Sequence, residues 1–243
     1  MIFVVIMIKL KDILMENDEL NILVPRRDKK EREKNRLIAV QKQIQKIQKD
    51  IQEYIKNGSV GHLDLRQAPI QTLPDNLTKV GGRLDLSNSY IIELPDNLTV
   101  DGDLNLYNTK IQKLPDNLTL YGSLYIGHTK IEFLPDNLKE INGDLEISDS
   151  PITELPDGLK VKGNFYINNT IYSNPPLKSL PDNLTVGGFL SIKNSKIQNI
   201  PKNMSVAGNL YLYNVTIQMY YKPERLKELL GVKGDIYIDD ELT

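Results

Sequence analysis

Hydrophobic and polar residues alternate over short stretches that recur roughly every twenty residues through most of the chain. Each stretch pairs two apolar residues around one outward position, which is the pattern of a short strand with one buried face. A repeat at a fixed period indicates a solenoid whose coils stack on one another. The nine predicted strand pairs are Leu63/Leu65, Leu84/Leu86, Leu104/Leu106, Leu124/Ile126, Leu145/Ile147, Phe165/Ile167, Leu190/Ile192, Leu210/Leu212 and Ile236/Ile238.

Each coil also carries two corner motifs. A Gly stands two positions before every strand pair, which indicates a position that needs a positive φ or has no room for a Cβ. Leu-Pro-Asp-Asn supplies the other corner in most coils, because Pro restricts φ and Asp and Asn bond their own backbone. The rest of a coil is too short for a helix, so we expect extended chain or a short 3-10 turn. The glycines are Gly61, Gly82, Gly102, Gly122, Gly143, Gly163, Gly188, Gly208 and Gly234.

A small hydroxyl side chain follows the first strand residue by five positions in six coils. Buried backbone groups at a turn need partners, so we expect these hydroxyls to bond the next coil. Ala68 and Val215 replace the hydroxyl in the first and penultimate coils, as terminal coils would. The hydroxyl residues are Ser89, Thr109, Thr129, Ser150, Thr170 and Ser195.

Residues 28–56 follow the period of a helix. Their apolar positions recur at alternating intervals of three and four, and Asn57 and Gly58 end the pattern. We interpret this amphipathic helix as a cap, since a solenoid needs its open ends covered. The alternative is oligomerisation through a coiled coil of residues 37–54, which would suit a structural or assembly protein. The apolar stripe consists of Leu37, Val40, Ile44, Ile47, Ile51 and Tyr54.

The predicted organisation is therefore an N-terminal segment with a capping helix, 1–58, and a solenoid with its C-terminal cap, 59–243. The apolar residues 1–10 are too short to span a membrane and make a poor signal peptide, so a cytoplasmic protein is expected. Residues 223–231 predict a short C-terminal helix, with Pro at its start and Gly at its stop.

Composition narrows the possible chemistry. The chain has a net charge of −2, no Cys and two His. We expect no disulfide, no thiolate metal site, no cofactor and no catalytic centre. The run Arg26–Arg36 holds seven basic and three acidic residues, and its interleaved signs favour a solvated helix start over a nucleic-acid contact.

The repeat pattern LxLxxTxIxxLPxxLxVxG resembles the leucine-rich repeat of short bacterial and bacteriophage type, over about residues 61–240. It is similar to the LPxxL repeats of secreted bacterial effectors, with Ser or Thr where the common repeat has a buried Asn. The resemblance implies a curved solenoid with a parallel sheet on its concave side and a protein-binding role, in a bacterial or host cytoplasm or a virion. The Cys-dependent ubiquitin ligase domain of some effectors does not carry over, because this chain has no Cys.

The residues that vary between coils are the candidates for binding. Strand residues that flank the buried pair face outward, and this face is rich in aromatic residues. Tyr is a frequent hot-spot residue, although Tyr also simply favours strands. Nine strands would span roughly 40 Å, enough for a protein partner, and aromatic rings beside carboxylates would also suit a carbohydrate. The predicted binding residues are Tyr107, Tyr125, Tyr166, Phe189, Tyr211, Tyr213 and Tyr237.

Overall fold

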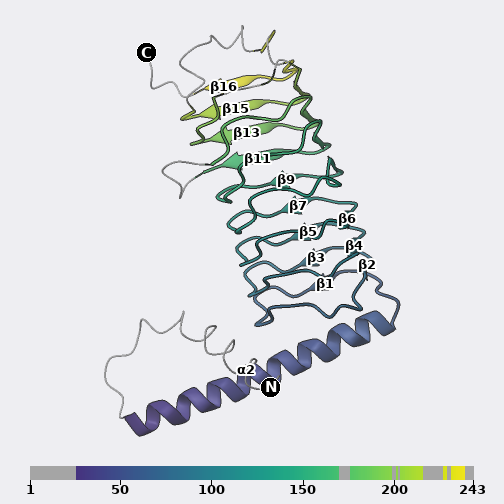
Figure 1. Cartoon of the computed structure of the whole chain (residues 1–243), viewed down its shortest axis with the longest axis vertical. Helices are drawn as coiled ribbons and strands as arrows, with labels where there is room; N and C mark the ends of the chain where they lie inside the picture. The colour runs from purple at the N-terminus through teal and green to yellow at the C-terminus, as the bar shows by residue number, and fades with distance from the viewer. Residues whose placement is uncertain are drawn as a thin grey trace.

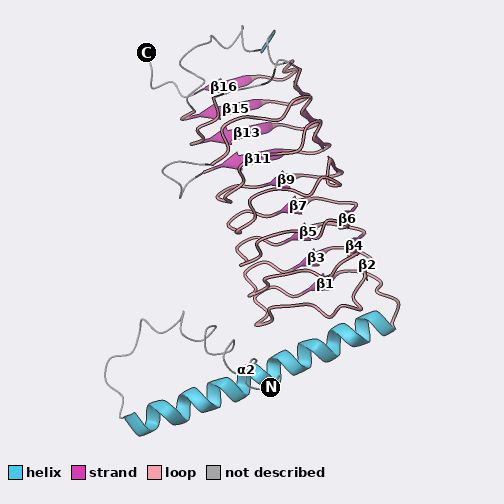
Figure 2. Ribbon diagram, in the orientation of Figure 1, coloured by secondary structure: helices cyan, strands magenta, loops and turns pink. Residues whose placement is uncertain are grey.

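The computed structural model describes residues 26–169, 176–198, 201, 203–215, 227–228 and 231–238. Within these residues one helix, α2 (Arg26–Lys56), precedes a stack of coils (Figure 1). Each coil consists of short strands joined by turns (Figure 2). The predicted C-terminal helix lies mostly outside the described residues, of which Lys227 and Glu228 are helical.

The main sheet has nine parallel strands and confirms the predicted repeat solenoid. Its register pairs the predicted strand residues, so that Leu63 lies opposite Leu84 and Leu210 lies opposite Ile236. The strands, in spatial order, are β1 (Leu63–Asp64), β3 (Leu84–Asp85), β5 (Leu104–Asn105), β7 (Leu124–Tyr125), β9 (Leu145–Glu146), β11 (Phe165–Asn168), β13 (Leu190–Lys193), β15 (Leu210–Tyr213) and β16 (Ile236–Ile238).

Two smaller parallel sheets lie on the segments that follow the Pro-Asp-Asn corners. Here the expected extended chain forms two-residue strands, whose apolar members point into the core. The three-stranded sheet contains β2 (Lys79–Val80), β4 (Thr99–Val100) and β6 (Thr119–Leu120); the four-stranded sheet contains β8 (Glu140–Ile141), β10 (Lys160–Val161), β12 (Thr185–Val186) and β14 (Ser205–Val206).

The core is a single column of Leu, Ile and Val side chains between the sheets and the returning segments. On either side of β5, the side chains of Leu98, Val100, Leu104, Leu106 and Ile111 are fully buried. Each coil therefore contributes one layer and buries it only against its neighbours, so the stack needs a cover at its ends.

The Gly column is explained by close packing, and only Gly61, in the first coil, has a positive φ. A Cβ at Gly102 would lie 2.8 Å from the carbonyl carbon of Gly82 in the preceding coil. A Cβ at Gly208 would lie 2.7 Å from the same atom of Gly188. Side chains other than hydrogen would therefore push adjacent coils apart along this column.

A second corner column, not predicted from the sequence, adopts the left-handed backbone conformation. Its members follow the first strand residue by four positions and have φ between +51° and +57°. Asn, Asp and His are enriched in this conformation, so the recurrence of these residue types at one position of the repeat could have predicted it. The members are Gln67, Asn88, Asn108, His128, Asp149, Asn194 and Asn214.

The hydroxyl column differs from its prediction. Thr109 and Thr129 each donate from Oγ1 to the carbonyl three residues earlier in their own coil, at 2.7 Å. Ser150 does bond another coil, donating to the Ile126 carbonyl at 2.5 Å. Adjacent coils are about 4.8 Å apart, so a short hydroxyl side chain reaches the carbonyl of its own turn more easily than one in the next coil. These hydroxyls therefore mainly close their own turns. Thr170 lies outside the described residues.

Helix α2 covers the first coil, as predicted. Ile51 is fully buried, and Ile44, Ile47, Tyr54 and Ile55 pack against the core. The N-terminal half of α2 reaches beyond the edge of the coils (Figure 1). The apolar contact between helix and core thus begins near the middle of the helix.

Polar contacts at the C-terminal end of α2 continue the pattern of the coils. The Tyr54 hydroxyl lies 2.9 Å from the carbonyl oxygens of Ser59 and Gly61 and accepts the Gly81 N–H at 3.2 Å. Burial raises the pKa of this hydroxyl. The amides of Gln52 and Asn76 bond each other in both directions, at 3.1 and 3.2 Å. In later coils such backbone and corner groups bond the preceding coil. In the first coil, α2 supplies these hydrogen-bond partners instead.

Candidate binding face

The candidate site is the outer face of the main sheet, defined as the side chains that flank the buried strand pairs and point away from the core. Many polar residues of this face are used by the fold itself. The residue directly before the strand accepts the N–H of its counterpart in the next coil, so its oxygen or nitrogen is a structural acceptor. The donor–acceptor pairs are Arg83 N to His62 Nδ1, Ser123 N to Asp103, Asp144 N to Ser123, Asn164 N to Asp144, Phe189 N to Asn164 and Asp235 N to Asn209, at 2.7–3.1 Å.

A second internal use of polar side chains occurs in four of the two-residue strands. In β1, β3, β5 and β9 the second strand residue is Asp, Asn or Glu, and its oxygen accepts the N–H two residues later at 2.9–3.1 Å. These strands stop after two residues. In β11, β13 and β15 the same position is Tyr166, Ser191 or Tyr211, and the strands extend to four residues. In these four coils a side-chain oxygen takes the N–H two residues on; β7, with Tyr125 at this position, is equally short, and the Gly127 N–H is accepted by Glu146 of the next coil.

The N-terminal end of the face is a network of opposite charges. Arg66 pairs with Asp64 at 2.6 Å, and Arg83 pairs with Asp85 at 2.6 Å. Asp85 is buried, and its other oxygen accepts the Ser87 N–H at 3.0 Å. Hydrogen bonds from Arg66 hold the pKa of Asp64 below its usual range. The charges in this region largely compensate one another.

The C-terminal end of the face is a continuous group of rings, which we call the aromatic row: Tyr166, Phe189, Tyr211, Tyr213 and Tyr237. Tyr166 meets Phe189 edge to face at 5.1 Å between centroids, and Phe189 meets Tyr211 in the same way at 5.6 Å. Tyr211 stacks on Tyr237 at 4.9 Å and on Tyr213 at 6.3 Å. Lys193 Nζ lies 4.9 Å from the centre of the Tyr213 ring. Five of the predicted binding residues are therefore in mutual contact.

The two remaining predicted residues, Tyr107 and Tyr125, lie in the middle of the face and line a hollow of about 320 Å³, which we call the sheet-face pocket. The other lining residues are Arg83, Asp103, Asn105 and Glu146. Tyr107 also meets His128 edge to face at 5.1 Å. The sequence placed the four polar residues on this face but did not indicate that they gather around the two rings.

Glu146 shapes one wall of the pocket by lying back over the preceding coil. Its two oxygens accept the N–H groups of Ser148 at 2.9 Å and Gly127 at 3.0 Å. Burial raises the pKa of Glu146, although these hydrogen bonds oppose the shift. The side chain occupies the space that a residue larger than Gly would fill at 127.

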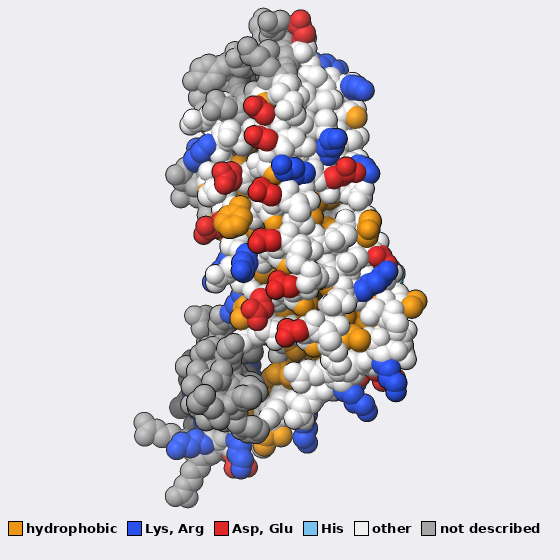
Figure 3. All heavy atoms as spheres, turned by 45° about the vertical axis from the view of Figure 1, so that its right-hand side comes forward, with side chains coloured by type: hydrophobic (Ala, Val, Ile, Leu, Met, Phe, Trp, Pro, Cys, Tyr) orange, Lys and Arg blue, Asp and Glu red, His pale blue; other side chains and the backbone are white. Residues whose placement is uncertain are grey.

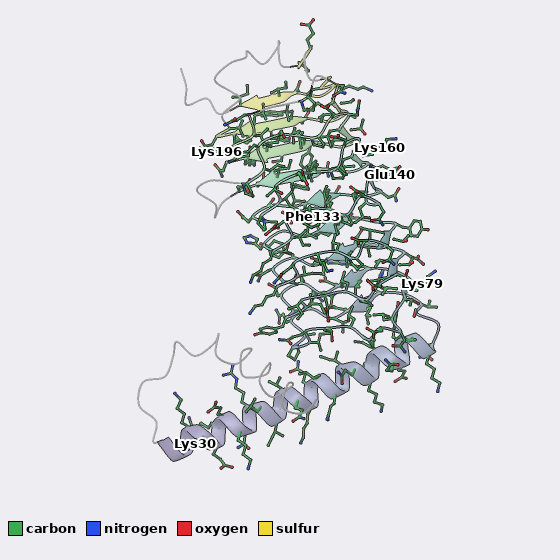
Figure 4. All side chains as sticks on the ribbon, viewed as in Figure 1. Lys30, Lys79, Phe133, Glu140, Lys160 and Lys196 are labelled. Carbon is green, nitrogen blue, oxygen red and sulfur yellow. The ribbon has the colours of Figure 1, made fainter. Side chains whose placement is uncertain are left out.

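The Pro-Asp-Asn corners form an acidic edge elsewhere on the stack. Hollows of about 630 and 390 Å³ lie along this edge. Figure 3 shows acidic side chains following one another along the stack, with Lys and Arg on both sides of them. Figure 4 places Lys79, Glu140 and Lys160 along one side. The exposed aspartates of the corners are Asp75, Asp96, Asp116, Asp136, Asp157 and Asp182.

The described residues offer neither a cluster of metal-binding side chains nor a helix that could span a membrane. They contain no group of three or more His, Cys, Asp or Glu side chains that could hold a metal ion. No helix among them is both long enough and apolar enough to cross a membrane.

Comparison with known proteins adds no further constraint on the function of the outer face. No family model and no curated protein matches the chain.

Proposed function

We propose that the chain is a leucine-rich-repeat solenoid that acts without catalysis, in a cytoplasm or a virion, by binding a protein partner on the outer face of its main sheet. The aromatic row is the observation that carries the proposal. Its rings are half-buried or exposed, and Tyr237 keeps 41% of its surface accessible. Rigid rings with polar tips supply contact area at low cost in side-chain entropy, which makes them frequent anchors of protein interfaces.

The mutual packing of the rings also serves the fold, since edge-to-face and stacked pairs stabilise neighbouring strands. A variant that tests binding must therefore remove rings at the rim of the row. Tyr213 and Tyr237 satisfy this condition, because both contact the row only through Tyr211 among its members.

The test is affinity capture with the full chain, comparing wild type with the variant Tyr213→Ser/Tyr237→Ser. We expect a specific partner whose retention falls at least about tenfold in the variant, as for loss of interface anchors. The matched control is Tyr121→Ser/Phe133→Ser, which removes two exposed rings outside the outer face. Equal retention by the variant and the wild type, with both folded by circular dichroism, would rule out the aromatic row as the binding site.

Assembly through α2 is the second candidate, favoured by the extent of the helix. The predicted stripe begins at Leu37, whereas contact with the described core begins at Ile44. If this stripe joins two copies, light scattering should show a dimer that the variant Leu37→Ser/Val40→Ser dissociates. A monomer at all accessible concentrations would exclude this candidate.

A further inference from the structure

The sheet-face pocket has the size of a site for one side chain. Its volume of about 320 Å³ lies at the lower end of the range for small-molecule sites, which runs from roughly 300 to 1,000 Å³. It also lies next to the aromatic row, because Glu146 pairs in register with Tyr125 on one side and Tyr166 on the other. A partner that covers the aromatic row would therefore reach the pocket.

The charges around the pocket favour a cation. Asp103 and Glu146 contribute two carboxyl groups, whereas Arg83 is the only basic side chain among the described residues that line it. The charge of Arg83 is compensated by Asp85, which holds its Nη2 at 2.6 Å and does not line the pocket. An anionic ligand would therefore meet two carboxyl groups and a guanidinium that is already paired.

The rings of the pocket point to the same chemistry. Tyr107 and Tyr125 line it together with the two carboxyl groups, and aromatic faces attract ammonium and guanidinium groups. Several polar atoms of the lining are already used inside the fold: Asp103 accepts the Ser123 N–H, and Asn105 accepts the Tyr107 N–H. A sugar would need many directed hydrogen bonds, whereas a cation gains from charge and ring faces without displacing these bonds.

We propose that the sheet-face pocket binds one ammonium or guanidinium group, the Lys or Arg side chain of the protein that docks on the aromatic row. This inference rests on the proposed function for the identity of the partner. The binding of a cation by the pocket is a separate property, and it can be measured without the partner.

The experiment titrates the full chain with N-acetyl-arginine methylamide and N-acetyl-lysine methylamide, followed by the amide NMR signals of Ser123, Gly127 and Ser148. We expect saturable shifts of these signals with at least one cationic probe. N-acetyl-norleucine methylamide and methyl glucoside, as uncharged probes, should produce none. No saturable shift with either cation, or equal shifts with an uncharged probe, would overturn the inference; saturation by the glucoside alone would instead indicate a carbohydrate site.

Two variants locate the site. Asp103→Asn keeps the oxygen that accepts the Ser123 N–H but removes the charge, and Tyr125→Ser removes one ring. Each should weaken cation binding about fivefold or more. Asp116→Asn on the acidic edge and Tyr237→Ser in the aromatic row should leave it unchanged. Unchanged affinity in both pocket variants would overturn the assignment.

Measuring partner retention and cation binding in the same variants distinguishes failure of this inference from failure of the proposed function. If Asp103→Asn loses cation binding while the chain still retains its partner in full, this inference fails and the proposed function stands. If Tyr213→Ser/Tyr237→Ser retains the partner in full while the pocket still binds the cation, the proposed function fails in its present form.

Discussion

The carboxylate of Glu146 lies over Gly127 of the preceding coil and accepts its N–H at 3.0 Å. A Cβ at residue 127 would collide with this carboxylate. Gly127 lies in a turn without a positive φ, so the residue must be Gly because the Glu146 side chain leaves no room for a Cβ. Glu146 also lines the sheet-face pocket, so the fold and the candidate site share this side chain.

Replacing Gly127 tests this relationship directly. Gly127→Ala should displace the carboxylate, leave two N–H groups without their acceptor and destabilise the chain by about 1–3 kcal/mol in urea unfolding. In the background of Glu146→Ala the same substitution should cost much less, because the colliding group is gone. A double-mutant cycle with no coupling between the two sites would contradict the contact.

The raised pKa of Glu146 predicts a dependence of stability on pH. Since burial raises the pKa in the folded state, the native chain holds this proton at pH values where the unfolded chain has lost it. Its contribution is fully present below the ordinary glutamate pKa of about 4.3 and is lost as pH rises through the folded value. The unfolding free energy of wild type relative to Glu146→Gln should fall across this window. A difference that is flat or rises with pH would contradict the shift.

The stacked glycines predict that two Gly substitutions differ in cost. Gly102→Ala should cost about 1–3 kcal/mol, because its Cβ would lie 2.8 Å from the Gly82 carbonyl carbon and 2.9 Å from the Arg83 nitrogen. Gly158 has a φ of +72° with open space around it, and Asn97 and Asn183 occupy the equivalent corner at +59° and +57°. Gly158→Asn should therefore change stability by less than about 0.5 kcal/mol. Equal costs for the two variants in urea unfolding would refute the packing explanation.

The Tyr54 hydroxyl predicts how firmly α2 is joined to the first coil. Tyr54→Phe removes the hydroxyl that bonds two carbonyl oxygens and shares the Gly81 N–H with the Ser59 carbonyl, and should cost about 1–2 kcal/mol. Tyr121→Phe, on an exposed ring, is the control and should be neutral. Thermal unfolding of both variants measures the difference, and the two values should not coincide if the hydroxyl stabilises the junction.

Periodicity in the sequence was sufficient to predict the framework. The Leu pairs specified the nine strands and their register, because shifting a strand such as β5 by one residue would turn Leu104 and Leu106 to the outside. The alternating intervals of three and four in residues 37–54 predicted a capping helix, and Ile51 is buried as that pattern requires. The Gly column was also recognised, since nine copies in one chain act as replicates of the same position.

The use of the polar outer residues was decided only by the tertiary structure. From the sequence, Asp144 and Asn164 resemble binding residues, yet each accepts an N–H from the next coil. Two-residue periodicity tells which side chains face outward, but hydrogen bonding between coils depends on their separation and on neighbours about twenty positions away. For the same reason the sequence predicted Tyr107 and Tyr125 as part of one binding face with the aromatic row. The stacking of the coils instead brings these two rings together with Glu146 in a separate pocket.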